Sequence, residues 1–126
     1  MPLILIADNQ VGHVFALDTV LSAVGYTVES ASTPAEVFAL AQQTSPQVIL
    51  LADNFATSGG ASLSTQLKAH PTLRQIPVVL YSDSIRLDHL EYVQRLGVDA
   101  VLRKPFTARD VLATVRPLVE RTAPTA

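Results

Sequence analysis

The stretch QVILLADNFATSGG (residues 47–60) carries the pattern that decides the fold. Its first six residues are almost entirely apolar and do not alternate with polar ones, which is typical of a strand buried on both faces of a parallel sheet. The run ends at Ala52 and Asp53, and a loop containing Gly59 and Gly60 follows. Because α/β proteins bind their ligands at the carboxyl ends of such strands, this is where we look for function.

Strand and helix patterns alternate on both sides of this stretch. Besides 47–52, the predicted strands are residues 2–7, 26–31, 76–82 and 98–103. The predicted helices are residues 11–24, 34–45, 61–69 and 84–96, and a last one that follows Thr107. This alternation predicts one α/β domain with a five-stranded parallel sheet and five helices.

Several helix ends carry recognisable caps. Thr33 followed three residues later by Glu36 forms a capping box, and Asp110 stands in the same relation to Thr107. Gly25 is expected to end the first helix. The apolar positions expected to face the core in that helix are Val11, Val14, Leu17, Leu21 and Val24. We place the domain at residues 1–119 and interpret 120–126 as a tail or the start of a linker.

Composition narrows the classes of function. The 126 residues include no cysteine, which excludes disulfides and thiolate chemistry. No apolar run approaches the roughly 18 residues that span a bilayer, and a net charge of −2 gives no reason to expect a membrane or nucleic-acid partner. We therefore expect a cytoplasmic protein.

Sequence motifs for nucleotide binding and for enzymatic catalysis are missing. There is no G-x-G-x-x-G, no phosphate loop ending in Lys and Ser or Thr, and no G-x-S-x-G. His13, His70 and His89 lie on separate predicted helices or helix ends and are interpreted as surface residues rather than metal ligands. We therefore do not expect an enzyme.

Polar residues nevertheless collect where the predicted strands end. The first strand ends at Asp8 and Asn9, the fourth at Ser82, and Lys104 follows the fifth. Because a lone cation beside a carboxylate favours an ion pair, we expect Lys104 to contact Asp8.

The chain resembles a response-regulator receiver domain over residues 3–119. The matching stretches are LILIADN, GYTVESASTPAEVFAL, PQVILLADN, IPVVLYSD and LGVDAVLRKPF. The resemblance implies a flavodoxin-like three-layer sandwich with strand order 2-1-3-4-5. In the family, a histidine kinase phosphorylates an Asp at the end of the third strand, and two acids after the first strand help to hold Mg²⁺.

The family's roles fall on this sequence with several departures. Asp8 takes the position of the first acid, Ser82 that of the hydroxyl residue and Lys104 that of the phosphoryl-contacting Lys. Asn9 replaces the second acid, and Val101 replaces a usual aromatic residue. Asp83 likewise stands where the family has a small residue.

The third strand decides between two acceptor positions. The family motif runs from a Pro through five residues to the phosphorylated Asp, with a loop Gly eight residues later. Counted from Pro46, the acceptor position is Ala52, and the Gly is Gly60. Asp53 would need a shift of one residue, which turns a side chain to the opposite face of a strand. The resemblance therefore implies an empty site at Ala52, with Asp53 as the alternate acceptor.

Two functions remain open. The preferred one is a degenerate receiver that binds a protein partner without phosphorylation and needs no cofactor. The alternative is a working phosphoacceptor that uses Asp53 and binds Mg²⁺ through Asp8 and Asp53. A small-molecule binder at the emptied pocket and direct DNA binding are weaker hypotheses, because no motif supports either.

A basic surface is the expected partner-binding site. All nine Lys and Arg residues lie from Lys68 onward. In the family, partners and homodimers use the face formed by the fourth helix, fifth strand and fifth helix. The residues expected on this face are Arg86, Tyr92, Arg95, Arg103, Arg109 and Arg116. The partner would be a histidine kinase, another regulator or an output domain; ordinary solvated charges are the competing interpretation.

Overall fold

Five parallel strands form one sheet at the centre of the protein. The computed structural model describes residues 2–52, 59–82, 97–103 and 107–122. Its strands are β1 (Leu3–Ala7), β2 (Thr27–Ala31), β3 (Val48–Ala52), β4 (Val78–Ser82) and β5 (Ala100–Arg103). Their spatial order is β2-β1-β3-β4-β5, and every neighbouring pair is parallel. The predicted strand order is therefore confirmed.

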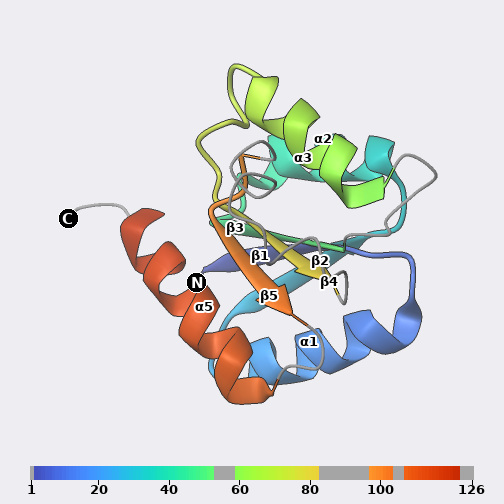
Figure 1. Cartoon of the computed structure of the whole chain (residues 1–126). Coiled ribbons are helices and arrows are strands. Elements are labelled where there is room, and N and C mark those ends of the chain that lie inside the picture. Colours follow the sequence, from blue (N-terminus) through green and yellow to red (C-terminus); the bar gives the residue numbers. More distant parts are fainter. Residues whose placement is uncertain (1, 53–58, 83–96, 104–106, 123–126) are drawn as a thin grey trace.

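Helices cover both faces of this sheet. The described helices are α1 (Val11–Ala23), α2 (Pro34–Thr44), α3 (Gly59–Ala69) and α5 (Ala108–Thr122). Helices α1 and α5 lie on one face, and α2 and α3 lie on the other (Figure 1). This is the predicted three-layer arrangement; the predicted helix 84–96 lies outside the described residues. In the described part of the chain, no helix is both long enough and apolar enough to cross a membrane.

The core is built on the three central strands. Every residue of β3 is buried, and so is every described side chain of β4. Because these strands are covered on both faces, their side chains need no polar alternation. The continuous apolar runs in the sequence therefore identified these strands correctly.

Both predicted N-caps form, and the one at the start of α5 is a complete capping box. Thr33 is extended, and its hydroxyl accepts a hydrogen bond of 3.2 Å from the backbone N–H of Glu36. At the start of α5, Asp110 N–H donates to the Thr107 hydroxyl at 3.1 Å, and Thr107 N–H donates to Asp110 at 2.8 Å. These bonds satisfy backbone donors that a helix end leaves without partners.

The predicted apolar face of α1 is only partly correct. Leu17 and Leu21 are buried, whereas Val11 is 82% exposed and Val24 is 38% exposed. Phe15, which the pattern did not single out, is 71% exposed. The error arises because α1 is apolar nearly all round, so that its sequence defines no single inward face.

Helix α5 is longer than predicted. It passes through Pro117 and continues to Thr122, so that residues 120–122 are helical rather than part of a tail. Leu118 and Val119 are buried just beyond the proline. This burial stabilises the last turn, although Pro117 removes one backbone donor.

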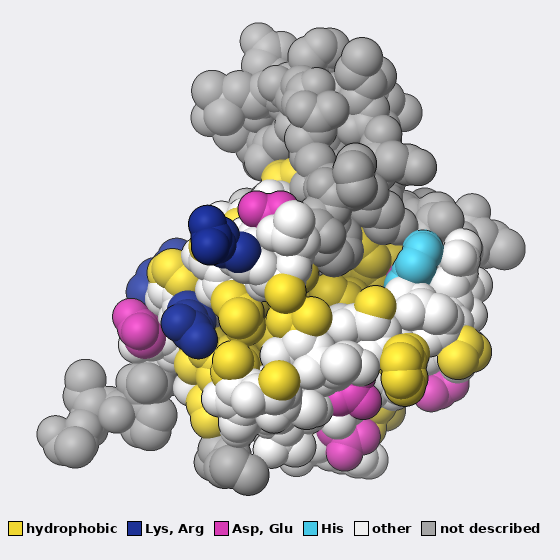
Figure 2. Space-filling model, turned by 90° about the horizontal axis from the view of Figure 1, so that it is seen from below, with side chains coloured by type: hydrophobic (Ala, Val, Ile, Leu, Met, Phe, Trp, Pro, Cys, Tyr) yellow, Lys and Arg dark blue, Asp and Glu magenta, His cyan; other side chains and the backbone are white. Residues whose placement is uncertain are grey.

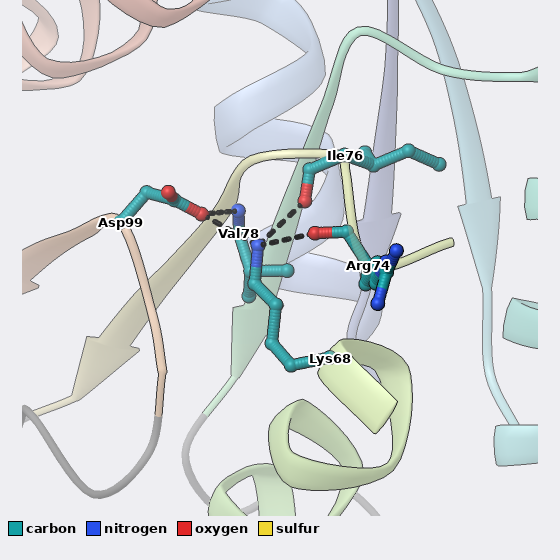
Figure 3. A network of polar contacts seen from close by, with 5 residues as sticks. All are labelled: Lys68, Arg74, Ile76, Val78 and Asp99. Atoms are coloured by element: carbon teal, nitrogen blue, oxygen red, sulfur yellow. Dashed lines mark hydrogen bonds and ion pairs between the residues drawn. The ribbon is translucent and has the colours of Figure 1, made fainter. Parts of the chain in front are cut away.

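A polar network ties α3 to the amino-terminal ends of β4 and β5 (Figure 3). The Lys68 ammonium group donates to the carbonyl oxygens of Arg74 at 3.3 Å and Ile76 at 2.9 Å. It also forms an ion pair of 2.8 Å with Asp99, whose same oxygen accepts from Val78 N–H at 2.8 Å. The network therefore joins segments that are distant in the sequence, at the end of the sheet opposite the site described next.

Candidate functional site

The candidate site lies at the carboxyl ends of β1, β3 and β4. Ala52 pairs with Tyr81, and Ala7 pairs with Leu51 one residue earlier on β3. Asp8 therefore stands level with Ala52. Because residues at one level of a parallel sheet point to the same face, Asp8, Ala52 and Tyr81 share one side of three adjacent strands.

Asp8 is a buried carboxylate with three described partners. The residue is 2% exposed. Its Oδ1 accepts from the backbone N–H of Gln10 at 2.9 Å. Its Oδ2 accepts from the hydroxyl of Tyr81 at 2.6 Å and lies 3.1 Å from Nδ1 of His13. Both carboxylate oxygens are thus engaged, which is how a protein accommodates a buried charged group.

Tyr81 is the residue of this site that the sequence interpretation missed. It is fully buried on β4, and its phenol donates the short bond to Asp8. Burial raises the pKa of Tyr81 well above its ordinary value, and the hydrogen bond and negative charge of Asp8 raise it further. The hydroxyl therefore keeps its proton. A tyrosine in an otherwise aliphatic strand was the available signal, because a buried phenol needs a polar partner.

His13 corrects a second expectation. It was interpreted as an ordinary surface residue, but its ring contacts Asp8, and its side chain is only 39% exposed. The start of α1 brings the ring back toward the end of β1. This contact was hard to predict, because five residues separate His13 from Asp8 and the contact depends on how the chain enters the helix.

The structure describes only some of the other predicted site residues. Asn9 is exposed, and Ala52 is fully buried. Asp53, Asp83 and Lys104 lie outside the described residues, as do the side chains of Ser82 and Arg103. The expected ion pair between Asp8 and Lys104 therefore stays a prediction, and the described partners of Asp8 are His13, Gln10 and Tyr81.

The expected basic face is described only at α5. Arg109 and Arg116 are exposed, and with neighbouring α5 residues they line a hollow of about 460 Å³. Arg86, Tyr92 and Arg95 lie outside the described residues.

The described residues do not fit a magnesium site. Mg²⁺ requires near-octahedral oxygen coordination, usually through one or two carboxylates. In the ranges that the structure describes, no group of three or more His, Asp or Glu side chains could hold a metal ion. Each oxygen of the Asp8 carboxylate already accepts a hydrogen bond.

The fold and the sheet order define a flavodoxin-like α/β domain. The chain matches the model of the response regulator receiver domain over residues 4–116. It therefore belongs to the response-regulator receiver family, the signalling modules of two-component systems.

Similar proteins and structures agree with this assignment. The transcriptional regulatory protein PrrA of Mycobacterium leprae is 30% identical over 125 residues, covering 99% of this chain and 53% of PrrA. The phosphate regulon regulator PhoB of Pseudomonas aeruginosa is 25% identical over 121 residues, covering 96% of this chain and 53% of PhoB. The chain thus spans about half the length of these regulators.

The similarity to solved structures extends over the whole domain. The receiver domain of a histidine kinase from Syntrophus aciditrophicus has a TM-score of 0.85 at 25% identity, covering 100% of this chain and 96% of that one. A response regulator from Chloroflexus aurantiacus has a TM-score of 0.87 at 20% identity, covering 96% and 100%. The second likeness supports the fold alone.

Proposed function

We propose that this receiver is degenerate and acts as a phosphorylation-independent protein-interaction module. The observation that carries the proposal is the position of Ala52, at the end of β3 and level with Asp8. This is the place where the family motif has its phosphorylated Asp. A methyl side chain offers no nucleophile, so acyl-phosphate chemistry has no starting group at this position.

The surroundings of Ala52 support the same proposal. Asp8 directs its carboxylate to Tyr81, His13 and the backbone of Gln10, and no group of three or more His, Asp or Glu side chains among the described residues could hold a metal ion. We therefore expect the module to work without a cofactor.

A phosphorylation assay tests the proposal. The domain is incubated with Mg²⁺ and a small acyl phosphate, and its intact mass is measured beside a receiver of known activity. We expect no phosphoryl adduct and no binding of beryllofluoride. A mass gain that disappears on Asp53→Ala would overturn the proposal in favour of the Asp53 alternative.

The partner surface is proposed at α5 and the segments beside it. Lys and Arg side chains lie on the side of α5, with acidic side chains beside them, whereas no Lys or Arg side chain is visible on the side of α1 in this view (Figure 2). Arg109 and Arg116 are exposed, and Arg is enriched at protein interfaces. We infer an acidic protein partner, which could be a histidine kinase, another regulator, an output domain or a second copy of the chain.

Charge reversal tests this surface. The variant Arg109→Glu with Arg116→Glu should weaken association with the partner, and higher salt should weaken it in the wild type. Arg74→Glu is the matched control, because Arg74 is exposed but lies outside α5. Sedimentation of the domain alone measures self-association. Equal binding by the double variant and the control would count against the surface.

A further inference from the structure

The hydrogen bond between Tyr81 and Asp8 joins two strands that are not neighbours. Tyr81 lies on β4 and Asp8 follows β1, and β3 runs between them. Adjacent strands lie about 4.8 Å apart, so the two backbones are separated by roughly 10 Å. The phenol must therefore cross β3 to reach the carboxylate.

Ala52 is the residue over which the phenol crosses. It pairs directly with Tyr81, stands level with Asp8 and is fully buried. Its methyl group is small enough to leave this path free. A longer side chain at position 52 would extend from the same face into the space of the ring, because core packing leaves few voids.

The same bond occupies the carboxylate that a cation would need. Oδ2 of Asp8 accepts a hydrogen bond of 2.6 Å from the phenol and lies 3.1 Å from Nδ1 of His13. Oδ1 accepts a hydrogen bond from the backbone N–H of Gln10. Hydrogen bonds to an ionised group are short and strong. A cation would have to displace at least one of them.

We propose that Tyr81 closes the emptied acceptor site, so that positions 52 and 81 form a matched pair and an acceptor carboxylate at 52 restores cation binding only when Tyr81 is also replaced. This inference rests on the proposed function, because it takes Ala52 as the acceptor position. It names the residue that keeps the site closed.

Cation binding tests the pair directly. Mn²⁺ binding is measured by electron paramagnetic resonance, with Mg²⁺ as competitor, for the wild type, Ala52→Asp, Tyr81→Val and the double variant. We expect the double variant to bind at least about tenfold more tightly than Ala52→Asp. Adding Asp8→Asn to the double variant should abolish binding. Equal binding by Ala52→Asp and the double variant would overturn the proposal.

A double-mutant cycle tests the steric part even if Ala52→Asp does not fold. Ala52→Val, Tyr81→Ala and their combination are compared by denaturant midpoint. We expect Ala52→Val to lower the denaturant midpoint of the wild type. In the Tyr81→Ala variant, the same substitution should lower the midpoint much less or raise it. Additive effects of the two substitutions would contradict a shared space.

The two proposals fail in different ways. Phosphorylation of the wild type on Asp53 would end the proposed function, whereas the double-mutant cycle would still report whether the side chains at positions 52 and 81 share one space. Additive substitutions with an unphosphorylated wild type would end only the assignment of Tyr81.

Discussion

At the scale of single residues, the structure describes three partners of the Asp8 carboxylate that the sequence did not predict. The sequence suggested that Asp8 would pair with Lys104, a residue that the structure does not describe. The observed partners of Asp8 are a phenol from β4, an imidazole from α1 and a backbone N–H. Both oxygens of this buried carboxylate therefore have hydrogen-bond partners among the described residues.

Removing the phenol hydroxyl should destabilise the domain. Tyr81→Phe keeps the ring but leaves Oδ2 of Asp8 without its shortest bond, which should cost about 1.5–3 kcal/mol of unfolding free energy. Urea unfolding gives the measurement. Tyr26→Phe is the matched control, because Tyr26 is only half-buried, and it should change stability by less than about 0.5 kcal/mol. Similar losses of unfolding free energy in both variants would show that the hydrogen bond to Asp8 does not stabilise the domain.

Alkaline pH should lower the stability of the domain through Tyr81. The pKa of Tyr81 is raised from 10.0 in the unfolded chain to well above it in the folded protein, through burial first and Asp8 second. Stability from this group is therefore fully present below about pH 10 and declines above it, as the unfolded phenol ionises and the folded one does not.

The size of this pH effect is measurable. The decline should approach about 1.4 kcal/mol per pH unit at pH values above the unfolded pKa. Urea unfolding is followed from neutral to alkaline pH in the wild type and in Tyr81→Phe. The difference between the two proteins isolates Tyr81 from the other titrating groups, and a difference independent of pH would refute the assignment.

At the scale of elements, α1 shows when helical periodicity fails to predict which residues are buried. Nearly every position of this helix is apolar or small, and Asp18 is its one charged residue. A pattern of this kind cannot tell the buried Leu17 from the exposed Val11 and Phe15, because only packing against the sheet selects the inward face. By contrast, the charged residues of α5 such as Arg109 and Arg116 are exposed, whereas Val111, Val115 and Val119 are buried, so that its polar and apolar faces are distinct.

Two substitutions two residues apart on α1 should differ sharply. Phe15→Ser should change the unfolding free energy by less than about 0.5 kcal/mol, because Phe15 is 71% exposed. Leu17→Ala should cost about 2–5 kcal/mol, because Leu17 is 2% exposed and its removal leaves a cavity. Thermal and urea unfolding measure both. A large loss from Phe15→Ser would mean that its ring is covered in solution.

At the scale of the whole molecule, the sequence predicted the architecture better than the site. Strand positions could be read because β3 and β4 are continuously apolar, and the sheet order followed from the family resemblance. The residues that surround Asp8 could not be found in the same way. Tyr81 is 73 residues from Asp8 in the chain, and their contact depends on three strands meeting in register. Counting along the motif assigned the acceptor position to Ala52, and this assignment stays a prediction.

The polar network at the opposite end of the sheet should contribute to the stability of the whole domain. Lys68→Met removes an ammonium group that donates to three acceptors. Because one of these acceptors, the Asp99 side chain, is 23% exposed, the loss of unfolding free energy should be about 1–2 kcal/mol. Arg74→Met is the matched control, because only the carbonyl of Arg74 takes part and remains in place. Urea unfolding at low and high salt provides the measurement, and equal stabilities of the two variants would rule out this role.

The Lys68–Asp99 ion pair also has a consequence for folding rates. It joins residues 31 positions apart, so that the chain must close a long loop before the pair can form. We therefore expect the pair to form after the transition state for folding. On this reasoning, Lys68→Met should leave the refolding rate nearly unchanged and accelerate unfolding, which makes the network a determinant of how long a folded molecule persists.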